Sequence, residues 1–231
     1  MLPVQAPGVY AGGANVIAVL ILLVEFGMFR QALLRDQVRL YASQSALIAV
    51  LAVLVGAVRH LPELYVLAAA TVALKVVAIP LVLRRLLRET GPAGAPAAGA
   101  DIAGSGGLGL ASTVLIAIVV AAFGFFAAGA LPISRSAAPV TALSVSLSVV
   151  LVAFVLMIQR QDVASQAIGL FSLENGISLA ALVVAASLPL ILEVALLFDL
   201  LLAVVVFGLL IRMHIGRAES LSTADLTSLR G

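Results

Sequence analysis

The chain has 231 residues, of which 63% are hydrophobic and only 10% are charged, and its mean hydropathy is +1.25. Soluble domains carry about a quarter of charged residues, so this composition excludes a water-soluble fold and predicts an all-α integral membrane protein. The formal net charge is +2, which excludes the strongly basic surface typical of nucleic-acid-binding proteins.

Seven segments are long and apolar enough to be transmembrane helices. A helix needs roughly 20 apolar residues to cross about 30 Å of hydrocarbon. In chain order, we expect the spans at residues 10–29, 40–58, 64–83, 108–130, 139–158, 163–187 and 190–211.

A stretch rich in Gly, Ala and Pro interrupts this series at residues 89–107. It has too few large apolar side chains to span the bilayer and too many helix breakers to fold alone, which predicts a linker. We therefore divide the chain into an N-terminal three-helix unit, this linker, a region with a linking helix, a C-terminal three-helix unit and a cytoplasmic tail. These parts cover residues 1–88, 89–107, 108–137, 138–217 and 218–231.

The arginines predict how the chain is oriented. If the N-terminus is outside, the inside loops and the tail hold ten arginines and the outside loops hold two. The inside set is Arg30, Arg35, Arg39, Arg84, Arg85, Arg88, Arg160, Arg212, Arg217 and Arg230, and the outside set is Arg59 and Arg135. Because cytoplasmic loops carry an excess of Lys and Arg, the N-terminus is expected outside and the C-terminus in the cytoplasm.

Similar short sequences recur at an offset of 130 residues. Arg30 and Gln31 align with Arg160 and Gln161, and YASQS at 41–45 aligns with FSLEN at 171–175. The pattern predicts that spans 1–3 and 5–7 are two copies of one three-helix unit in parallel orientation, as transport proteins use. The alternative is chance similarity among helices rich in Leu, Val and Ala.

Three ionisable residues lie near the middle of predicted spans: Lys75 in the third, Glu174 in the sixth and Asp199 in the seventh. A charge at the bilayer centre costs at least about 2.5–3.5 kcal/mol, so such residues usually face protein or water and mark a pathway. We expect the two carboxyl groups to open into one polar cavity, with Lys75 as the nearby ammonium, and to load and release protons. The alternative is an ion pair that only holds helices together.

Two further carboxylates lie nearer the membrane surfaces. Glu193 is close to the outer end of the seventh span, and Glu25 lies in the inner half of the first. Both are candidates for the proton pathway, but side chains at these depths are expected to reach toward the interface. Gln44 and Asn175, together with Ser172, are expected to form hydrogen bonds between helices.

The sequence offers no ligand set for a metal, iron–sulfur or haem site. There is no Cys, and the two His residues, His60 and His214, have no carboxylate or imidazole at ligand spacing. We therefore expect neither a cofactor nor catalytic residues in this chain.

Several motifs point to a known family. The run IQRQDVASQAIGLFSLENGISLAAL at 158–182, the spacing LE-x5-D that ends at Asp199, and the tail LSTADLTSLRG resemble component E of hydrogenase-4 and its relatives in formate hydrogenlyase-type complexes. YASQS and ALKVVAIPLVL in the first half agree with the same family. The resemblance covers nearly the whole chain outside the linker.

This resemblance implies a membrane subunit of a complex related to respiratory complex I. Its C-terminal part is similar to the small K-type subunit of that enzyme and of multi-subunit cation antiporters, in which carboxylates within helices carry protons. By position, Glu174 and Asp199 match such carboxylates and Lys75 matches a family lysine. The first carboxylate of the K-type subunit falls about one turn earlier, where this chain has Phe171.

The resemblance also implies partners and a location. The partners are antiporter-like membrane subunits and a complex-I-like membrane anchor, with peripheral redox subunits that carry NiFe and iron–sulfur centres. This chain is then a non-redox subunit in the bacterial inner membrane that helps to couple electron transfer to movement of H⁺, or secondarily Na⁺. Two alternatives remain: a scaffold that docks antiporter-like subunits, and a stand-alone ion transporter, which the repeat suggests.

Overall fold

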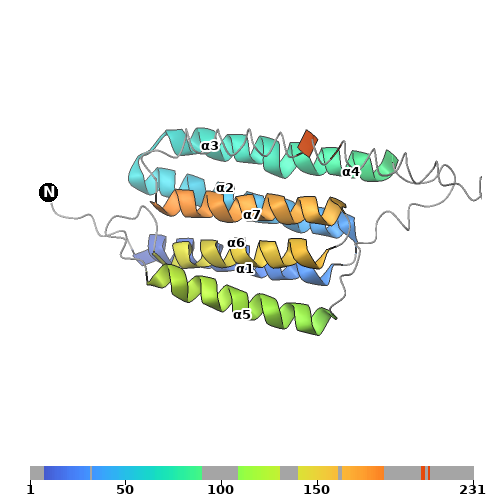
Figure 1. The fold of residues 1–231 in the computed structure, drawn as a ribbon. Coiled ribbons are helices and arrows are strands. Elements are labelled where there is room, and N and C mark those ends of the chain that lie inside the picture. Colours follow the sequence, from blue (N-terminus) through green and yellow to red (C-terminus); the bar gives the residue numbers. More distant parts are fainter. Residues whose placement is uncertain are drawn as a thin grey trace, which may run out of the picture.

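The computed structural model describes residues 8–31, 33–89, 109–130, 140–160 and 163–184, together with positions 204, 205 and 208. Within these residues the regular elements are all helices (Figure 1). They are α1 (Gly8–Arg30), α2 (Leu34–Arg59), α3 (Glu63–Thr71), the π-helix η1 (Val72–Ala78), α4 (Ile79–Glu89), α5 (Leu110–Gly129), α6 (Val140–Gln159) and α7 (Val163–Val184).

Six helices in the described part of the chain are long and apolar enough to cross a membrane. They are α1, α2, the continuous rod of α3, η1 and α4, then α5, α6 and α7. The predicted all-helical fold is thus confirmed in the described residues, and the first six predicted spans coincide with these apolar helices. The seventh span falls outside the described residues, except for positions 204, 205 and 208, and so does nearly all of the linker.

Helix α2 begins at Leu34, six residues before the predicted start at residue 40. Its first turns are amphipathic, because Leu34 and Val38 are buried while Arg35 and Arg39 are exposed. Arg39 also pairs with Asp36 at 2.8 Å. Because these turns carry charged residues, they lie outside the apolar run that defines the predicted span. This explains why the predicted span begins later than the helix.

The third span contains a π-helix, which the sequence did not predict. Lys75 lies in the middle of η1, and the N–H of Ile79 donates to the carbonyl of Leu74, five residues earlier. Pro80 follows directly. It has no N–H, and its ring would clash with the carbonyl four residues before it, so a widened turn is favoured here. Widened turns of this kind are frequent at functional sites.

The helices α1, α2, α6 and α7 form the centre of the bundle (Figure 1). Helix α1 lies beside α6 and runs in the same direction, because Asn15 contacts Thr141 at their starts and Arg160 donates to the carbonyl of Phe29 at their ends. Helix α5 packs on the outside of α6. The rod of α3, η1 and α4 packs against α2.

Helix α7 packs against α2, and the rings of Tyr41 and Phe171 lie 5.7 Å apart between them. These two residues are a pair that the 130-residue offset aligns. The two-copy arrangement itself stays a prediction, because the third helix of the second copy lies almost wholly outside the described residues.

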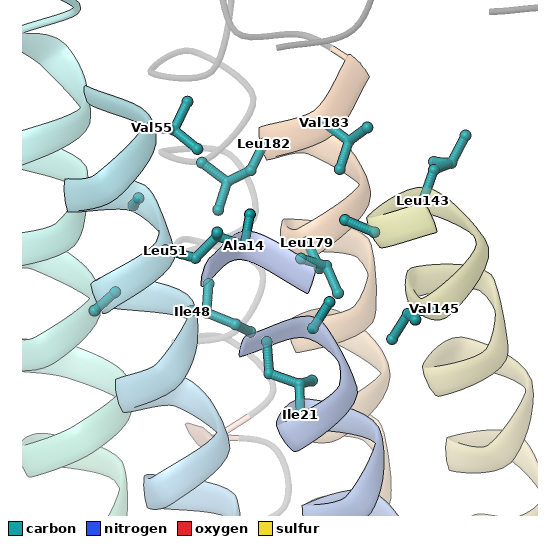
Figure 2. Packing of buried hydrophobic residues seen from close by; sticks show 14 of the residues in the cluster. Ala14, Ile21, Ile48, Leu51, Val55, Leu143, Val145, Leu179, Leu182 and Val183 are labelled. Atoms are coloured by element: carbon teal, nitrogen blue, oxygen red, sulfur yellow. The ribbon is translucent and has the colours of Figure 1, made fainter. Parts of the chain in front are cut away.

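Two apolar clusters fill the bundle, one toward each end. The first includes Ile21, Leu51 and Leu179, and Figure 2 shows these side chains meeting from α1, α2 and α7. The second includes Met28 and Phe171. Large apolar side chains also point outward, and the largest exposed fractions are 78% at Ile158 and 75% at Phe126. Such an apolar exterior suits a hydrocarbon solvent.

Candidate functional site

A layer of buried polar side chains lies between the two apolar clusters. On α1, Glu25 lies between Ile21 of the first cluster and Met28 of the second. On α2, Gln44 lies in the same way between Ile48 and Tyr41. We call this set the polar layer, and it consists of Glu25, Gln44, Ser45, Lys75, Ser172, Glu174, Asn175 and Ser178.

The polar layer is closed to the surroundings of the bundle. Glu174 is the most exposed member at 7%, and Glu25, Lys75 and Asn175 are fully buried. A polar group in an apolar interior costs several kcal/mol unless it finds a partner, so the contacts within the layer determine what it can do.

One side of the layer carries opposite charges. The Lys75 Nζ lies 2.8 Å from Glu174 Oε1 and donates to Ser178 Oγ at 3.0 Å. Glu174 and Ser178 are four residues apart on α7 and therefore share one face of that helix. This face meets Lys75 of η1, and we call the group the charged side.

The other side consists of a carboxyl group, amides and hydroxyls. Gln44 Nε2 donates to Glu25 Oε2 at 2.7 Å, and the Ser172 hydroxyl contacts the same oxygen. Ser172 Oγ also lies 3.0 Å from Gln44 Oε1. Asn175 Nδ2 donates to Gln44 Oε1 at 3.0 Å and to Ser45 Oγ at 2.9 Å. Because the partners of Glu25 in this group are uncharged residues, we call the group the uncharged side, and it joins α1, α2 and α7.

The two acidic residues have different partners. Within the described residues, the hydrogen-bond partners of Glu25 are Gln44 and Ser172, and no basic side chain pairs with it. Glu174, by contrast, has the Lys75 ammonium. The layer therefore holds one carboxyl group beside a base and one among neutral groups.

Helix α7 supplies half of the polar layer and is held close to α6. A Cβ at Gly176 would lie 2.7 Å from Val150 Cγ2 and 3.0 Å from Val150 N. At Gly169, a Cβ would lie 2.6 Å from Met157 Cγ. These glycines let the two backbones approach, as small residues do between membrane helices. The approach fixes the position of α7 and thereby of the polar side chains on its other faces.

The structure brings most of the predicted pathway residues together. Lys75 lies against Glu174, while Glu25, Gln44 and Asn175 meet on the uncharged side. Asp199 and Glu193 fall outside the described residues, so their expected place beside Glu174 stays a prediction.

Glu25 differs from its expectation. Its position in the sequence favours a side chain that reaches toward the interface, but Glu25 is 0% exposed. The helix continues for more than a turn beyond it to Arg30, and Gln44 and Ser172 bind its carboxyl group within the bundle. The distance of Glu25 from the end of its apolar run therefore did not predict where its side chain points. Polar partners on two other helices lie at the same depth and bind its carboxyl group.

Two members of the layer were missed as site residues. Ser178 binds Lys75, and its spacing of four residues from Glu174 is the signal that could have identified it. Ser45 binds Asn175 and follows Gln44 directly, but adjacent helix positions diverge, so sequence alone did not connect them. Within the described residues, no group of three or more His, Asp or Glu side chains could hold a metal ion.

Comparison with known proteins finds an uncharacterized relative. The chain is 32% identical over 198 residues to the uncharacterized protein Rv0085 of Mycobacterium tuberculosis, and the alignment covers 85% of each chain. No protein-family model matches the chain. No solved structure matches it. By identity and coverage, the chain belongs to the same family as Rv0085.

Proposed function

We propose that the chain is a non-redox membrane subunit of a complex-I-like hydrogenase or formate hydrogenlyase-type complex. In this complex it contributes a proton pathway that couples electron transfer in partner subunits to ion translocation across the bacterial inner membrane. The observation that carries the proposal is the buried pair of Lys75 and Glu174, 2.8 Å apart between two apolar clusters. The resemblance to component E of hydrogenase-4 supports the choice of complex.

The Lys75–Glu174 pair has the chemistry of a proton-handling site. Ionisable side chains within a membrane bundle are costly and usually belong to proton or ion pathways. When Glu174 accepts a proton, Lys75 loses its counter-charge, so the proton on Glu174 changes the electrostatic environment of the pair. In this mechanism Glu174 and Asp199 take up and release protons through internal water, and Lys75 biases their charge. Glu25 and Glu193 are further members of the pathway.

The free energy needed to move a proton across the membrane is small compared with that of a redox reaction. Moving one charge across 100 mV takes about 2.3 kcal/mol, which electron transfer in the partner subunits must supply. Those partners would carry the NiFe and iron–sulfur centres. Antiporter-like subunits and a complex-I-like anchor would bind in the membrane, where α5 presents exposed Phe123 and Phe126.

A scaffold role is the second candidate, and one observation favours it. Polar contacts of the layer join different helices, since Gln44 of α2 binds Glu25 of α1 and Lys75 of η1 binds Glu174 of α7. Interhelical polar contacts of this kind hold membrane helices together without carrying ions. A scaffold would dock antiporter-like subunits through its outer faces.

Inverted vesicles from cells that carry the Glu174→Gln variant separate the two candidates. We expect the complex to assemble, as seen by native electrophoresis, while acidification of the vesicles, followed with a pH-sensitive dye, is lost. Glu63→Gln is the matched control, because Glu63 is exposed in the first turn of α3.

Two results would count against a proton pathway. Unchanged acidification in the double variant Glu174→Gln and Asp199→Asn would reject it. Loss of assembly in Glu174→Gln, with normal coupling in the complex that survives, would favour the scaffold instead.

A further inference from the structure

Glu25 lies in surroundings that oppose a negative charge. It is fully buried on α1 between the two apolar clusters, and no basic side chain of the described residues pairs with it. An isolated carboxylate in an apolar interior is so costly that such a group normally becomes neutral instead. Burial and the lack of a basic partner among the described residues thus both favour the protonated form.

The charged and titratable groups on the neighbouring helices do not offset this cost. Tyr41 lies one turn before Gln44 on α2 and contacts Phe171. On α7, Glu174 adds a second carboxyl group and pairs with Lys75 of η1. Helix α6 has no ionisable side chain, and Arg160, which follows it, donates to backbone carbonyls at the end of α1.

The hydrogen atoms around Glu25 provide an independent argument. A serine hydroxyl carries one hydrogen, whereas Ser172 Oγ lies within hydrogen-bond distance of both Glu25 Oε2 and Gln44 Oε1. Gln44 Oε1 acts as an acceptor, because Asn175 Nδ2 donates to it. The Gln44 amide nitrogen donates to Glu25 Oε2.

If Glu25 is ionised, the two contacts of Ser172 Oγ share a single hydrogen atom, so one of them has none. The single hydrogen of Ser172 would serve one oxygen and leave lone pairs facing each other at the second contact. With a proton on Glu25 Oε2, the carboxylic acid donates to Ser172 Oγ, and Ser172 donates to Gln44 Oε1. Each contact then contains one hydrogen, and Gln44 Nε2 still donates to Glu25 Oε2.

We infer that Glu25 is a proton-binding site whose resting form is the neutral carboxylic acid, held as a donor to Ser172. When the proton leaves to water, the Ser172 hydroxyl turns from Gln44 Oε1 to Glu25 Oε2 and becomes a donor to the new carboxylate. The polar layer then stores a proton at Glu25 and keeps opposite charges at Lys75 and Glu174. The use of this proton in translocation rests on the proposed function, whereas the protonation state itself does not.

Infrared spectroscopy of the full chain in lipid bilayers tests the inference. At neutral pH we expect the C=O stretching band of a protonated carboxylic acid, which shifts in heavy water. The band should disappear in Glu25→Gln and persist in the matched variant Glu174→Gln. In Ser172→Ala it should move to higher frequency, because the acid loses its hydrogen-bond acceptor.

The inference is overturned if the Glu25→Gln spectrum keeps the full band, or if no such band exists. If Glu25→Gln does not fold, the Ser172→Ala spectrum decides, because an unmoved band then shows that the acid is not beside Ser172. The spectra are recorded without any translocation. A missing Glu25 band and a normal acidification of Glu174→Gln vesicles are therefore separate failures, the first of this inference and the second of the proposed function.

Discussion

The two sides of the polar layer hold a buried carboxyl group by different means. On the charged side, Glu174 has an ammonium at 2.8 Å and a serine in the same group. On the uncharged side, Glu25 has an amide and a hydroxyl and no base among the described residues. Helix α7 borders both sides, so the contrast arises within one bundle and at one depth. This contrast teaches that burial alone does not determine whether an acid is charged. The hydrogen-bond donors and bases around the carboxyl group also determine its charge.

The largest expected effect is on the charged side. We expect Lys75→Met to lower the free energy of unfolding by about 3–5 kcal/mol, because it leaves Glu174, only 7% exposed, without its base. Reversible unfolding in mixed micelles with increasing SDS measures this loss.

The double variant Lys75→Met and Glu174→Met sharpens the result. Replacing both members of a buried ion pair by apolar side chains is often neutral or stabilising, so most of the loss should be recovered. Arg30→Met is the matched control for removing a positive charge, since Arg30 is exposed at the end of α1. If Lys75→Met costs no more than Arg30→Met, the pair contributes nothing to the fold.

A smaller effect is expected on the uncharged side. Asn175→Leu keeps roughly the same volume but removes the donors to Gln44 and Ser45. Hydrogen bonds between membrane helices contribute on average about 0.6 kcal/mol each, so the loss should be about 1–2 kcal/mol in the same unfolding measurement. Ser43→Ala serves as the control, because exposed Ser43 donates to Arg39 within its own helix. Equal losses in the two variants would mean that the uncharged side does not hold the helices together.

Much of this arrangement could be predicted from the sequence, because hydrocarbon thickness limits where an apolar helix begins and ends. Six predicted spans agree with helices in the described residues. The same reasoning put Lys75 and Glu174 near mid-depth, and the structure places them 2.8 Å apart.

The sequence could not predict which face of α1 points into the bundle. Nearly every face of this helix is apolar, so no polar face distinguishes the outer side from the inner one. Depth alone therefore favoured the interface for Glu25, whereas α1 turns this residue toward Gln44 and Ser172. The π-helix was missed for a related reason. Pro80 predicts a local distortion but does not say which carbonyls shift, or that the widened turn carries Lys75.

The smallest expected effect gives the sharpest test of the contrast. Because Gln has nearly the shape of a neutral glutamic acid, we expect Glu25→Gln to lower the free energy of unfolding by only about 0.6 kcal/mol, the average contribution of one hydrogen bond between membrane helices. Its amide hydrogens can replace the acid proton as the donor to Ser172, but an amide nitrogen cannot accept from Gln44 Nε2, so one hydrogen bond is lost. Glu174→Gln removes the counter-charge of buried Lys75 and should cost about 3–5 kcal/mol by the same measurement. If Glu25 is instead ionised, Glu25→Gln removes an unpaired buried charge, and the variant should be clearly more stable than the natural chain. A gain in stability would thus break the contrast between the two sides, and a small loss beside a large loss for Glu174→Gln would establish it.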